Sequence, residues 1–183
     1  MYERSRKVSR KGSENLDKHL LEALYHRYYK ELYIFVYSLC GSETVTDDIL
    51  QDTFLKALLA LKDSHTNMRA WLYMVARNLF YNQQKKKSKE ILTEEQNDIP
   101  EESTNGDLLE NILAEESRRL LYQSIQKLEV RKREIIQMQY FGGMSQKEIA
   151  AILYITPENV RVLAYRAKKE LKKYLESYEM END

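Results

Sequence analysis

Basic and aromatic side chains follow one another between residues 158 and 173, and their chemistry suits nucleic acid. This segment holds six basic and two acidic residues. Arginine can donate two hydrogen bonds to a guanine edge, and lysine binds phosphates, which position a protein without specifying a sequence. At helical spacing, one face would carry Arg161, Tyr165, Lys168, Lys169 and Lys172, with Arg166 beside it. The alternative is a solvated surface helix that only keeps the protein soluble.

The residues around this segment predict a helix-turn-helix. Ser145 and Glu148 have the spacing of a capping box, which predicts the start of a first helix. Thr156 can cap a second helix, and Pro157 suits its first turn. The second helix would turn an apolar stripe toward a core: Val160, Leu163, Ala164, Ala167, Leu171 and Leu175. Two helices joined by a short turn, the second one basic, are typical of the motif, although Tyr154 stands where glycine often supplies a left-handed backbone.

A second candidate surface lies on a helix predicted from about Arg69 to Lys86. Its core stripe is Trp71, Leu72, Val75, Ala76 and Leu79. Cations and aromatic rings alternate four residues apart beside that stripe, at Arg69, Tyr73, Arg77, Tyr81 and Lys85, and Asn78 flanks them. Bases of a single strand stack on rings while cations bind phosphates, so this pattern suits single-stranded nucleic acid. The alternative is a purely structural role, in which the tyrosines are half-buried against their neighbours. We favour a contact surface for Tyr73, Arg77 and Tyr81, and a place in the core for Trp71.

A short acidic face is predicted on the helix that runs from Thr46, its expected cap, to about Leu61. The face carries Asp47, Asp48, Gln51 and Asp52. Acids in the first turn of a helix stabilise its dipole by roughly 0.3–1 kcal/mol each, which alone could explain Asp47 and Asp48. A compact acidic patch could equally bind a basic partner, and the residues leave both explanations open.

Catalytic and metal-binding motifs are not apparent in the sequence. The three histidines are scattered, and no glycine-rich phosphate loop, serine elbow or zinc-protease motif is present. The adjacent Asp47 and Asp48 would point about 100° apart on a helix, so they would not converge on one atom. The single cysteine, Cys40, excludes an internal disulfide and continues an apolar stripe, so we expect a small buried hydrophobe. We expect no enzyme activity, no metal and no cofactor.

Composition predicts an all-α protein of two small domains. Of 183 residues, only 5 are Gly and 2 are Pro, which favours helices over a turn-rich β fold. The net charge of zero hides an acidic centre, since residues 90–117 hold ten acidic residues and no Lys or Arg. We predict a disordered basic tail at 1–15, an N-terminal helical domain at 16–88, a flexible acidic linker at 89–107 and a C-terminal helix-turn-helix domain at 108–183. One cysteine, no secretory signal and no apolar run of membrane-spanning length lead us to expect a cytoplasmic protein without membrane insertion.

Three segments in this order resemble the extracytoplasmic-function sigma factors of the sigma-70 family, which direct bacterial RNA polymerase to promoters. They are DDILQDTFLKAL (47–58), WLYMVARN (71–78) and the region from Leu128 to Leu175, which includes FGGMSQKEIAAIL and NVRVLAYRAKKELKK. The resemblance covers nearly all the chain except the first fifteen residues and the acidic linker. The sequence departs from the family pattern at Tyr154 and in LEVRKREII, where the family commonly has a proline after the leucine.

The resemblance implies a role for each surface. The acidic face of Asp47, Asp48, Gln51 and Asp52 would dock on the clamp helices of the largest subunit of core RNA polymerase. The minus-ten promoter element would be read as an unpaired strand by Lys62, His65, Asn67, Arg69, Tyr73, Arg77, Asn78, Tyr81 and Lys85. The minus-thirty-five element would be contacted as a duplex by Arg161, Val162, Tyr165 and Arg166, with Lys169 and Lys172 on phosphates. An anti-sigma factor is implied as a further partner, and the acidic linker would thread through the polymerase cleft.

Two other function classes fit parts of the sequence. A standalone helix-turn-helix regulator with an N-terminal dimerisation domain would bind duplex DNA without polymerase. A nuclease or recombinase with a helical DNA-binding domain fits less well, because no catalytic cluster is visible.

Overall fold

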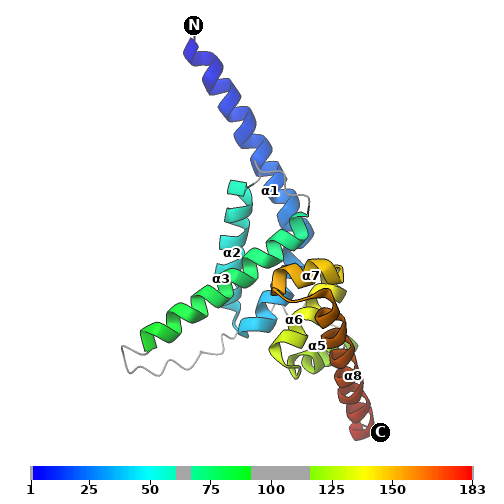
Figure 1. The fold of residues 1–183 in the computed structure, drawn as a ribbon. Helices are drawn as coiled ribbons and strands as arrows, with labels where there is room; N and C mark the ends of the chain where they lie inside the picture. The colour runs from blue at the N-terminus through cyan, green and yellow to red at the C-terminus, as the bar shows by residue number, and fades with distance from the viewer. Residues whose placement is uncertain (1, 61–66, 92–115, 183) are drawn as a thin grey trace.

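The computed structural model describes residues 2–60, 67–91 and 116–182, and every regular element in these ranges is a helix (Figure 1). The N-terminal domain consists of α1 (Tyr2–Cys40), α2 (Glu43–Ala60) and α3 (Met68–Ile91). The C-terminal domain consists of α5 (Glu116–Gln126), α6 (Val130–Ile136), the π-helical turn η1 (Gln137–Phe141), α7 (Gln146–Leu153) and α8 (Pro157–Asn182). The predicted all-α class is therefore confirmed. Among the described residues, no helix combines the length and apolar character that a membrane crossing needs.

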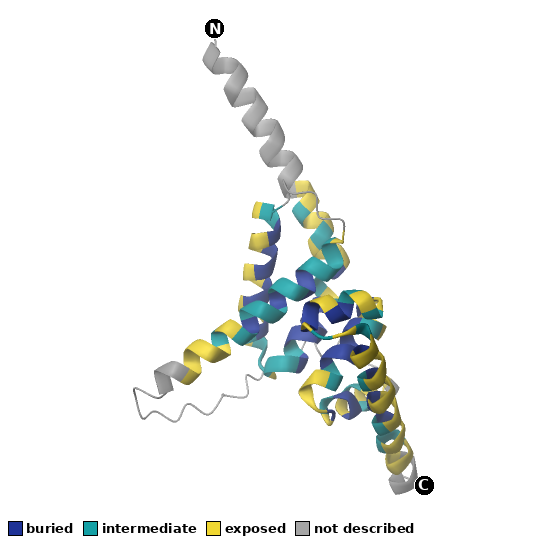
Figure 2. Ribbon diagram, in the orientation of Figure 1, coloured by how far each residue is buried: buried dark blue, intermediate teal, exposed yellow. Residues whose placement is uncertain are grey.

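The three helices of the N-terminal domain pack through apolar side chains on the facing sides of the helices. The side chains they bury include Leu32, Phe35, Val36, Ile49, Leu50, Phe54, Leu72 and Ala76. Figure 2 shows that the buried segments gather where the helices cross, whereas residues 84–88 of α3 and 176–178 of α8 are exposed. Burial of apolar surface is the main favourable contribution to folding, so these crossings are where the fold is held together.

The start of α2 differs from the sequence prediction. Gly41 ends α1 with a φ of 67°, and the Ser42 hydroxyl then accepts a 3.5 Å hydrogen bond from the Val45 backbone. Thr46, the predicted cap, is instead buried inside α2, where its hydroxyl donates to the Ser42 carbonyl at 2.7 Å. The helix begins at Glu43, so Asp47 lies beyond the first turn. The stabilisation that acids give to the helix dipole falls off within that turn. It therefore does not explain the presence of the whole acidic face.

The N-terminal end of α1 also differs, since the structure continues the helix to Tyr2 where a disordered tail was predicted. The added segment contains no proline. Extending an existing helix fixes only one residue for each new hydrogen bond, so nothing in these residues forces an end to the helix. The predicted linker falls partly in α3, which runs to Ile91, and from residue 92 onward it lies outside the described residues.

The C-terminal domain contains the predicted helix-turn-helix in α7 and α8. Ser145 and Glu148 form both hydrogen bonds of the capping box, and the Thr156 hydroxyl accepts a 3.2 Å bond from the Asn159 backbone. Pro157 is the first residue of α8. The apolar stripe of α8 faces the core, as predicted: Val160 and Ala164 are buried in the cluster that includes α7, Ala167 and Leu171 are buried against α5 and α6, and Leu163 and Leu175 are half-buried.

The two domains pack directly against each other. One cluster of buried side chains extends from Phe35 and Leu72 of the N-terminal domain to Ile135 and Met138 of the C-terminal domain. Arg133 in α6 reinforces this packing, since its guanidinium donates to the Ser38 carbonyl of α1 at 2.6 Å and to the carbonyls of Gln126 and Leu128. No sequence pattern indicated this arrangement, because its contacts join residues far apart in the chain.

The turn between α7 and α8 uses a left-handed tyrosine. Tyr154 has φ 55° and ψ 46°, and its side chain is 76% exposed. A left-handed conformation costs a residue with a Cβ roughly 1–2 kcal/mol. The motif therefore keeps the geometry that glycine normally supplies, at the expense of backbone strain.

Tyr154→Gly should raise the free energy of unfolding by about 0.5–1 kcal/mol, because relief of strain exceeds the greater freedom of glycine in the unfolded chain. Urea denaturation followed by circular dichroism measures this change. Tyr165→Gly is the matched control, since Tyr165 is also exposed but lies within α8, where glycine should lower stability by about 0.5–1 kcal/mol. Equal destabilisation by both substitutions would contradict the assignment of strain to Tyr154.

Candidate nucleic-acid and protein interfaces

The basic face of α8 is open to solvent. All six side chains assigned to the minus-thirty-five element are exposed: Arg161, Val162, Tyr165, Arg166, Lys169 and Lys172. Lys172 forms a 3.5 Å ion pair with Glu176 one turn later, in which both side chains are largely exposed. Such an exposed pair contributes little to stability, so Lys172 can exchange it for a phosphate at small cost.

Helix α7 fixes the orientation of this face. Its apolar side chains Ile149, Ile152 and Leu153 are buried against α8 and the rest of the core. The Ile155 backbone donates to the Ala150 carbonyl across the turn at 3.1 Å. Hydrogen bonds from Ser145 hold the pKa of the Glu148 carboxyl below its ordinary value, which favours the charged carboxylate that completes the capping box.

The stripe on α3 is not an exposed surface in this arrangement, which corrects the preference stated for Tyr73. Tyr73 is 0% exposed, and its ring lies 4.8 Å from that of Phe35. It also packs against Gly142, where an added Cβ would come within 3.1 Å of the tyrosine hydroxyl. Burial raises the pKa of Tyr73, so the phenol remains neutral. The docked C-terminal domain contributes to the burial of Tyr73. Helical periodicity alone could not reveal this contact.

Arg77 and Tyr81 are held by a carboxylate of the C-terminal domain. Arg77 Nε lies 2.8 Å from Oε1 of Glu134, and the Tyr81 hydroxyl donates to the same oxygen at 3.1 Å. Glu134 is 1% exposed and Arg77 is 12% exposed, so this ion pair is largely withdrawn from water. Burial raises the pKa of Glu134, while Arg77 and Tyr81 oppose the rise. Burial and the nearby carboxylate of Glu134 raise the pKa of Tyr81 to about 12.

The remaining minus-ten candidates lie in several environments. Asn67 accepts a 3.1 Å bond from the Ala70 backbone at the start of α3, and its amide donates to Glu148 of the C-terminal domain. Arg69 forms a 3.1 Å ion pair with Glu31 of α1. Asn78 is half-buried and Lys85 is exposed. Lys62 and His65 lie outside the described residues.

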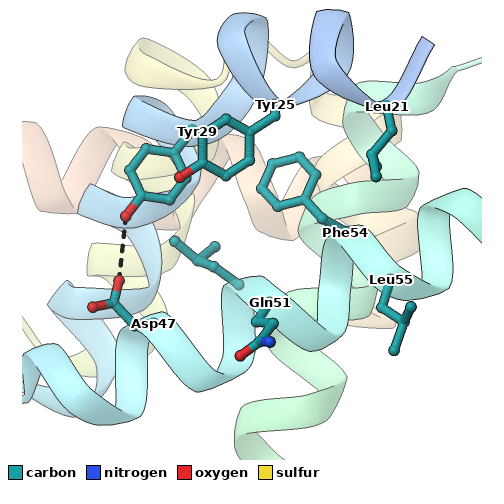
Figure 3. Close-up of a pocket in the computed structure, with 8 residues that line it drawn as sticks. Leu21, Tyr25, Tyr29, Asp47, Gln51, Phe54 and Leu55 are labelled. Atoms are coloured by element: carbon teal, nitrogen blue, oxygen red, sulfur yellow. Dashed lines mark hydrogen bonds between the residues drawn. The ribbon is translucent and has the colours of Figure 1, made fainter. Parts of the chain in front are cut away.

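The acidic face of α2 is exposed beside an apolar groove between α1 and α2 (Figure 3). Asp47, Asp48, Gln51 and Asp52 are all exposed, and Asp47 accepts a 3.2 Å hydrogen bond from Tyr29. Burial and the nearby Asp47 raise the pKa of Tyr29, so it stays a donor. The groove is lined by Leu21, Tyr25, Tyr29, Leu50, Phe54 and Leu55 together with Asp47 and Gln51.

Two leucines on this face were missed by sequence reasoning. Leu55 and Leu59 are 53% and 74% exposed; Leu55 follows Asp52 by three residues, and Leu59 follows Leu55 by four. The sequence does indicate this feature, since two leucines stand on an otherwise polar face of the helix. Solvent-exposed leucines beside acids suit a partner that offers both apolar and basic side chains.

The described residues contain no group of three or more His, Cys, Asp or Glu side chains placed to hold a metal ion. Cys40 is half-buried rather than fully buried, and its sulfur lies 3.3 Å from the Ser42 carbonyl and 3.2 Å from the Thr46 hydroxyl. It therefore belongs to the connection between α1 and α2.

Comparison with known proteins gives two family matches on this chain. Residues 24–90 match Sigma-70 region 2, and residues 118–171 match Sigma-70, region 4. The first match spans α2 and nearly all of α3, and the second spans the helix-turn-helix up to the buried Leu171 of α8. Both regions occur in one chain, so the standalone regulator is not favoured.

Curated relatives agree with these matches. RNA polymerase sigma factor YlaC of Bacillus subtilis (strain 168) is 31% identical over 156 residues, which covers 84% of this chain and 90% of that protein. The ECF RNA polymerase sigma factor SigM of the same organism is 25% identical over 158 residues, covering 83% of this chain and 93% of that protein.

Solved structures agree on the fold. The sigma factor RpoE in complex with the anti-sigma factor NepR from Bartonella quintana superposes with a TM-score of 0.62 at 24% identity, covering 89% of this chain and 98% of that one. CnrH, solved with the cytosolic domain of CnrY, gives 0.59 at 25% identity, covering 87% and 90%. The chain thus belongs to the extracytoplasmic-function sigma factors of the sigma-70 family, and it acts as an RNA polymerase sigma factor, a transcription initiation factor.

Proposed function

We propose that this sigma factor divides promoter recognition between α8 and α3 and docks on core polymerase through α2. The observation that supports this division best is the open face of α8, where all six candidate contacts are exposed and all but Lys172 lie within the matched region 4. Helix α8 would enter the major groove of the minus-thirty-five element, as the second helix of this motif does. Polymerase would hold the two readers at the required separation, which raises their effective concentration on one promoter.

Within α8, base reading and phosphate binding fall to different residues. Arg161, Val162 and Tyr165 lie near the start of the helix, where the motif contacts base edges. Lys169 and Lys172 lie about one to three turns farther along, where phosphate contacts would fix the orientation of the helix. Arg166, between the two groups, is exposed on the same helix and is assigned to base reading.

Arg161→Ala should relax sequence preference in the minus-thirty-five element, because a good bidentate pair gives about 1–3 kcal/mol of discrimination. Lys172→Ala should instead weaken all promoters about equally and reduce the salt slope of binding by about one. Reconstituted holoenzyme transcribing a library randomised in that element, at two salt concentrations, measures both effects. If both substitutions lower every promoter in parallel, α8 is an electrostatic anchor and Arg161 reads no base.

The acidic face of α2 is our candidate for the core polymerase contact. Its acids lie beyond the first turn of the helix, so a purely helix-stabilising role is not sufficient. They border the groove and the exposed leucines Leu55 and Leu59. Clamp helices of the largest polymerase subunit, which the family resemblance implies as the partner, would meet this combination of charge and apolar surface.

Replacing both Asp48 and Asp52 with Lys should weaken binding to core polymerase at least tenfold, a change of about 1.4 kcal/mol, because it reverses the charge that faces the partner. Titration of labelled protein with core polymerase measures the change, and circular dichroism checks that helicity is kept. Replacing Glu22 and Glu176 with Lys is the matched control, since both are exposed, on α1 and α8, and the charge change is the same. Equal loss from both double variants would show that net charge alone is responsible.

The same proposal assigns the minus-ten element to α3 and includes an anti-sigma factor as a further partner. Helix α3 and the segment before it would read the minus-ten element as an unpaired strand, which assists promoter opening. An anti-sigma factor would cover the polymerase-binding surfaces in the cytoplasm, so its binding and that of core polymerase should exclude each other in a competition experiment. This partner is supported by family membership and by relatives solved with anti-sigma factors.

A further inference from the structure

Two exposed helical faces of this chain carry complementary side chains. On α2, residues at steps of four, three and four form one stripe: Asp48, Asp52, Leu55 and Leu59. All four side chains are exposed, and they fall within about 60° of the helix circumference. Along the helix, the first two positions of this stripe are acidic and the last two are apolar.

A stripe of the opposite order follows α8. It consists of Val162, Tyr165, Lys169 and Lys172, at steps of three, four and three, and it spans about 80° of the circumference. All four side chains are exposed. Here the apolar positions come first and the basic positions last, so the two stripes match when the helices run antiparallel.

The match holds along the whole length of both stripes. In an antiparallel pair the valine and tyrosine of α8 face the two leucines of α2, and the two lysines face the two aspartates. The stripes are about 16 and 15 Å long at 1.5 Å per residue, so the four positions stay in register. The groove between α1 and α2 opens beside Leu55 and has a volume of about 430 Å³, which offers the ring of Tyr165 an apolar site.

The charges of both stripes are available to a partner. Asp48, Asp52 and Lys169 form no ion pair among the described residues. Lys172 pairs with Glu176, and both side chains of that pair are largely exposed. Helices α2 and α8 belong to different domains (Figure 1), and both stripes are exposed in the same molecule. They therefore do not satisfy each other within one chain.

We propose that the stripe of α2 binds the stripe of α8 from a second copy of the same chain. Each copy uses one face in one contact and the other face in the next, so the association is head-to-tail. The zero net charge favours it, because no overall repulsion keeps the copies apart. An interface of two short helical stripes is smaller than the roughly 800 Å² per partner of a standard complex, so the association is weak and reversible.

This association covers the two faces that we propose for core polymerase and for promoter DNA. Free copies therefore withdraw both faces from other partners until polymerase takes up α2. The association depends only on the two stripes, whereas the competition with polymerase rests on the proposed function of α2.

Sedimentation velocity of the full chain over a range of concentrations tests the proposal. At about 50 mM salt we expect the weight-average sedimentation coefficient to rise with concentration. At about 500 mM salt we expect a monomer, because the screening length falls to roughly 4 Å. A monomer at every concentration in low salt would overturn the proposal, as would an association that salt does not weaken.

Charge reversal locates the contact. Replacing Asp48 and Asp52 with Lys should abolish association at low salt. Replacing Lys169 and Lys172 with Glu should do the same. All four substitutions in one chain should restore association, because the reversed stripes are complementary again. Circular dichroism checks that each variant keeps its helicity, and a folded four-substitution variant that stays monomeric would refute the contact.

A matched variant separates this contact from the effect of net charge. The two lysine substitutions on α2 are combined with Lys86→Glu and Lys87→Glu, which also keeps the net charge at zero. Lys86 and Lys87 are exposed on α3, outside both stripes. We expect this variant to stay monomeric. Association as strong as that of the unsubstituted chain would show that net charge alone is responsible, and the proposal would fail.

A neutral substitution tests the apolar half of the contact. Tyr165→Ala should weaken association about tenfold, as expected for an aromatic side chain that fills a site on the partner. Tyr140→Ala is the control, since Tyr140 is 55% exposed, against 66% for Tyr165, but lies in η1 outside the stripe. Equal association by the two alanine variants would contradict the proposed register.

Core polymerase distinguishes this association from the proposed function. Added to fluorescently labelled chains that have associated at low salt, it should disperse them into complexes with one copy each. If polymerase binds the associated chains without dispersing them, α2 is not the polymerase contact, and the proposed function fails while the association stands. If the chain is monomeric at low salt but lysines at Asp48 and Asp52 still weaken polymerase binding, the association alone is refuted.

Discussion

A carboxylate buried between two domains must be neutralised by its neighbours, and this requirement on Glu134 governs how the two domains of this sigma factor meet. An isolated buried charge is very costly, so Glu134 needs the guanidinium of Arg77 and the hydroxyl of Tyr81 at hydrogen-bonding distance. Those two groups lie one turn apart on α3, which fixes both the position and the rotation of α6 against that helix. The packing of Tyr73 under Gly142 and the Arg133 bonds to α1 are then consistent with the same placement.

The three candidate surfaces are consequently in different states in one structure. The basic face of α8 and the acidic face of α2 depend only on helices within their own domains, so docking leaves them unchanged. The stripe on α3 carries the same residue types that bind a phosphate, and a carboxylate can satisfy them equally well. Residues suited to an anionic ligand are available for an intramolecular acid whenever the fold brings one near, which connects the chemistry of recognition with the stability of the closed form.

Local patterns were enough to predict the helix-turn-helix from the sequence. The capping box at Ser145, the Thr156 cap and the stripe of α8 involve residues only a few positions apart, and the structure confirms each of them. Tyr154 shows that residue type alone does not determine backbone conformation, because this tyrosine adopts a left-handed conformation that its own preference disfavours. The prediction for Thr46 was wrong because serine and threonine both suit a cap, and only the geometry of the Gly41 turn selects Ser42.

The expectation that Tyr73, Arg77 and Tyr81 form an exposed surface on α3 failed for a different reason. Periodicity assigns a residue to a face of its helix, but it does not say what covers that face. Glu134 reads as an ordinary charged residue in LEVRKREII, and its partner Arg77 lies 57 residues away. Long-range contacts of this kind leave no signal in a single sequence, so the burial of Tyr73 and Arg77 could only come from the structure.

If α3 reads a single strand as proposed, the packing of the two domains couples the binding equilibria of this protein. If a single strand binds only the open form, then any partner that binds the open form more tightly improves strand binding by the same factor, and the strand improves the binding of that partner equally. Core polymerase needs only a preference for separated domains to act in this way. The zero net charge already disfavours non-specific attraction to DNA, and the docked C-terminal domain covers Tyr73 and most of Arg77 on α3.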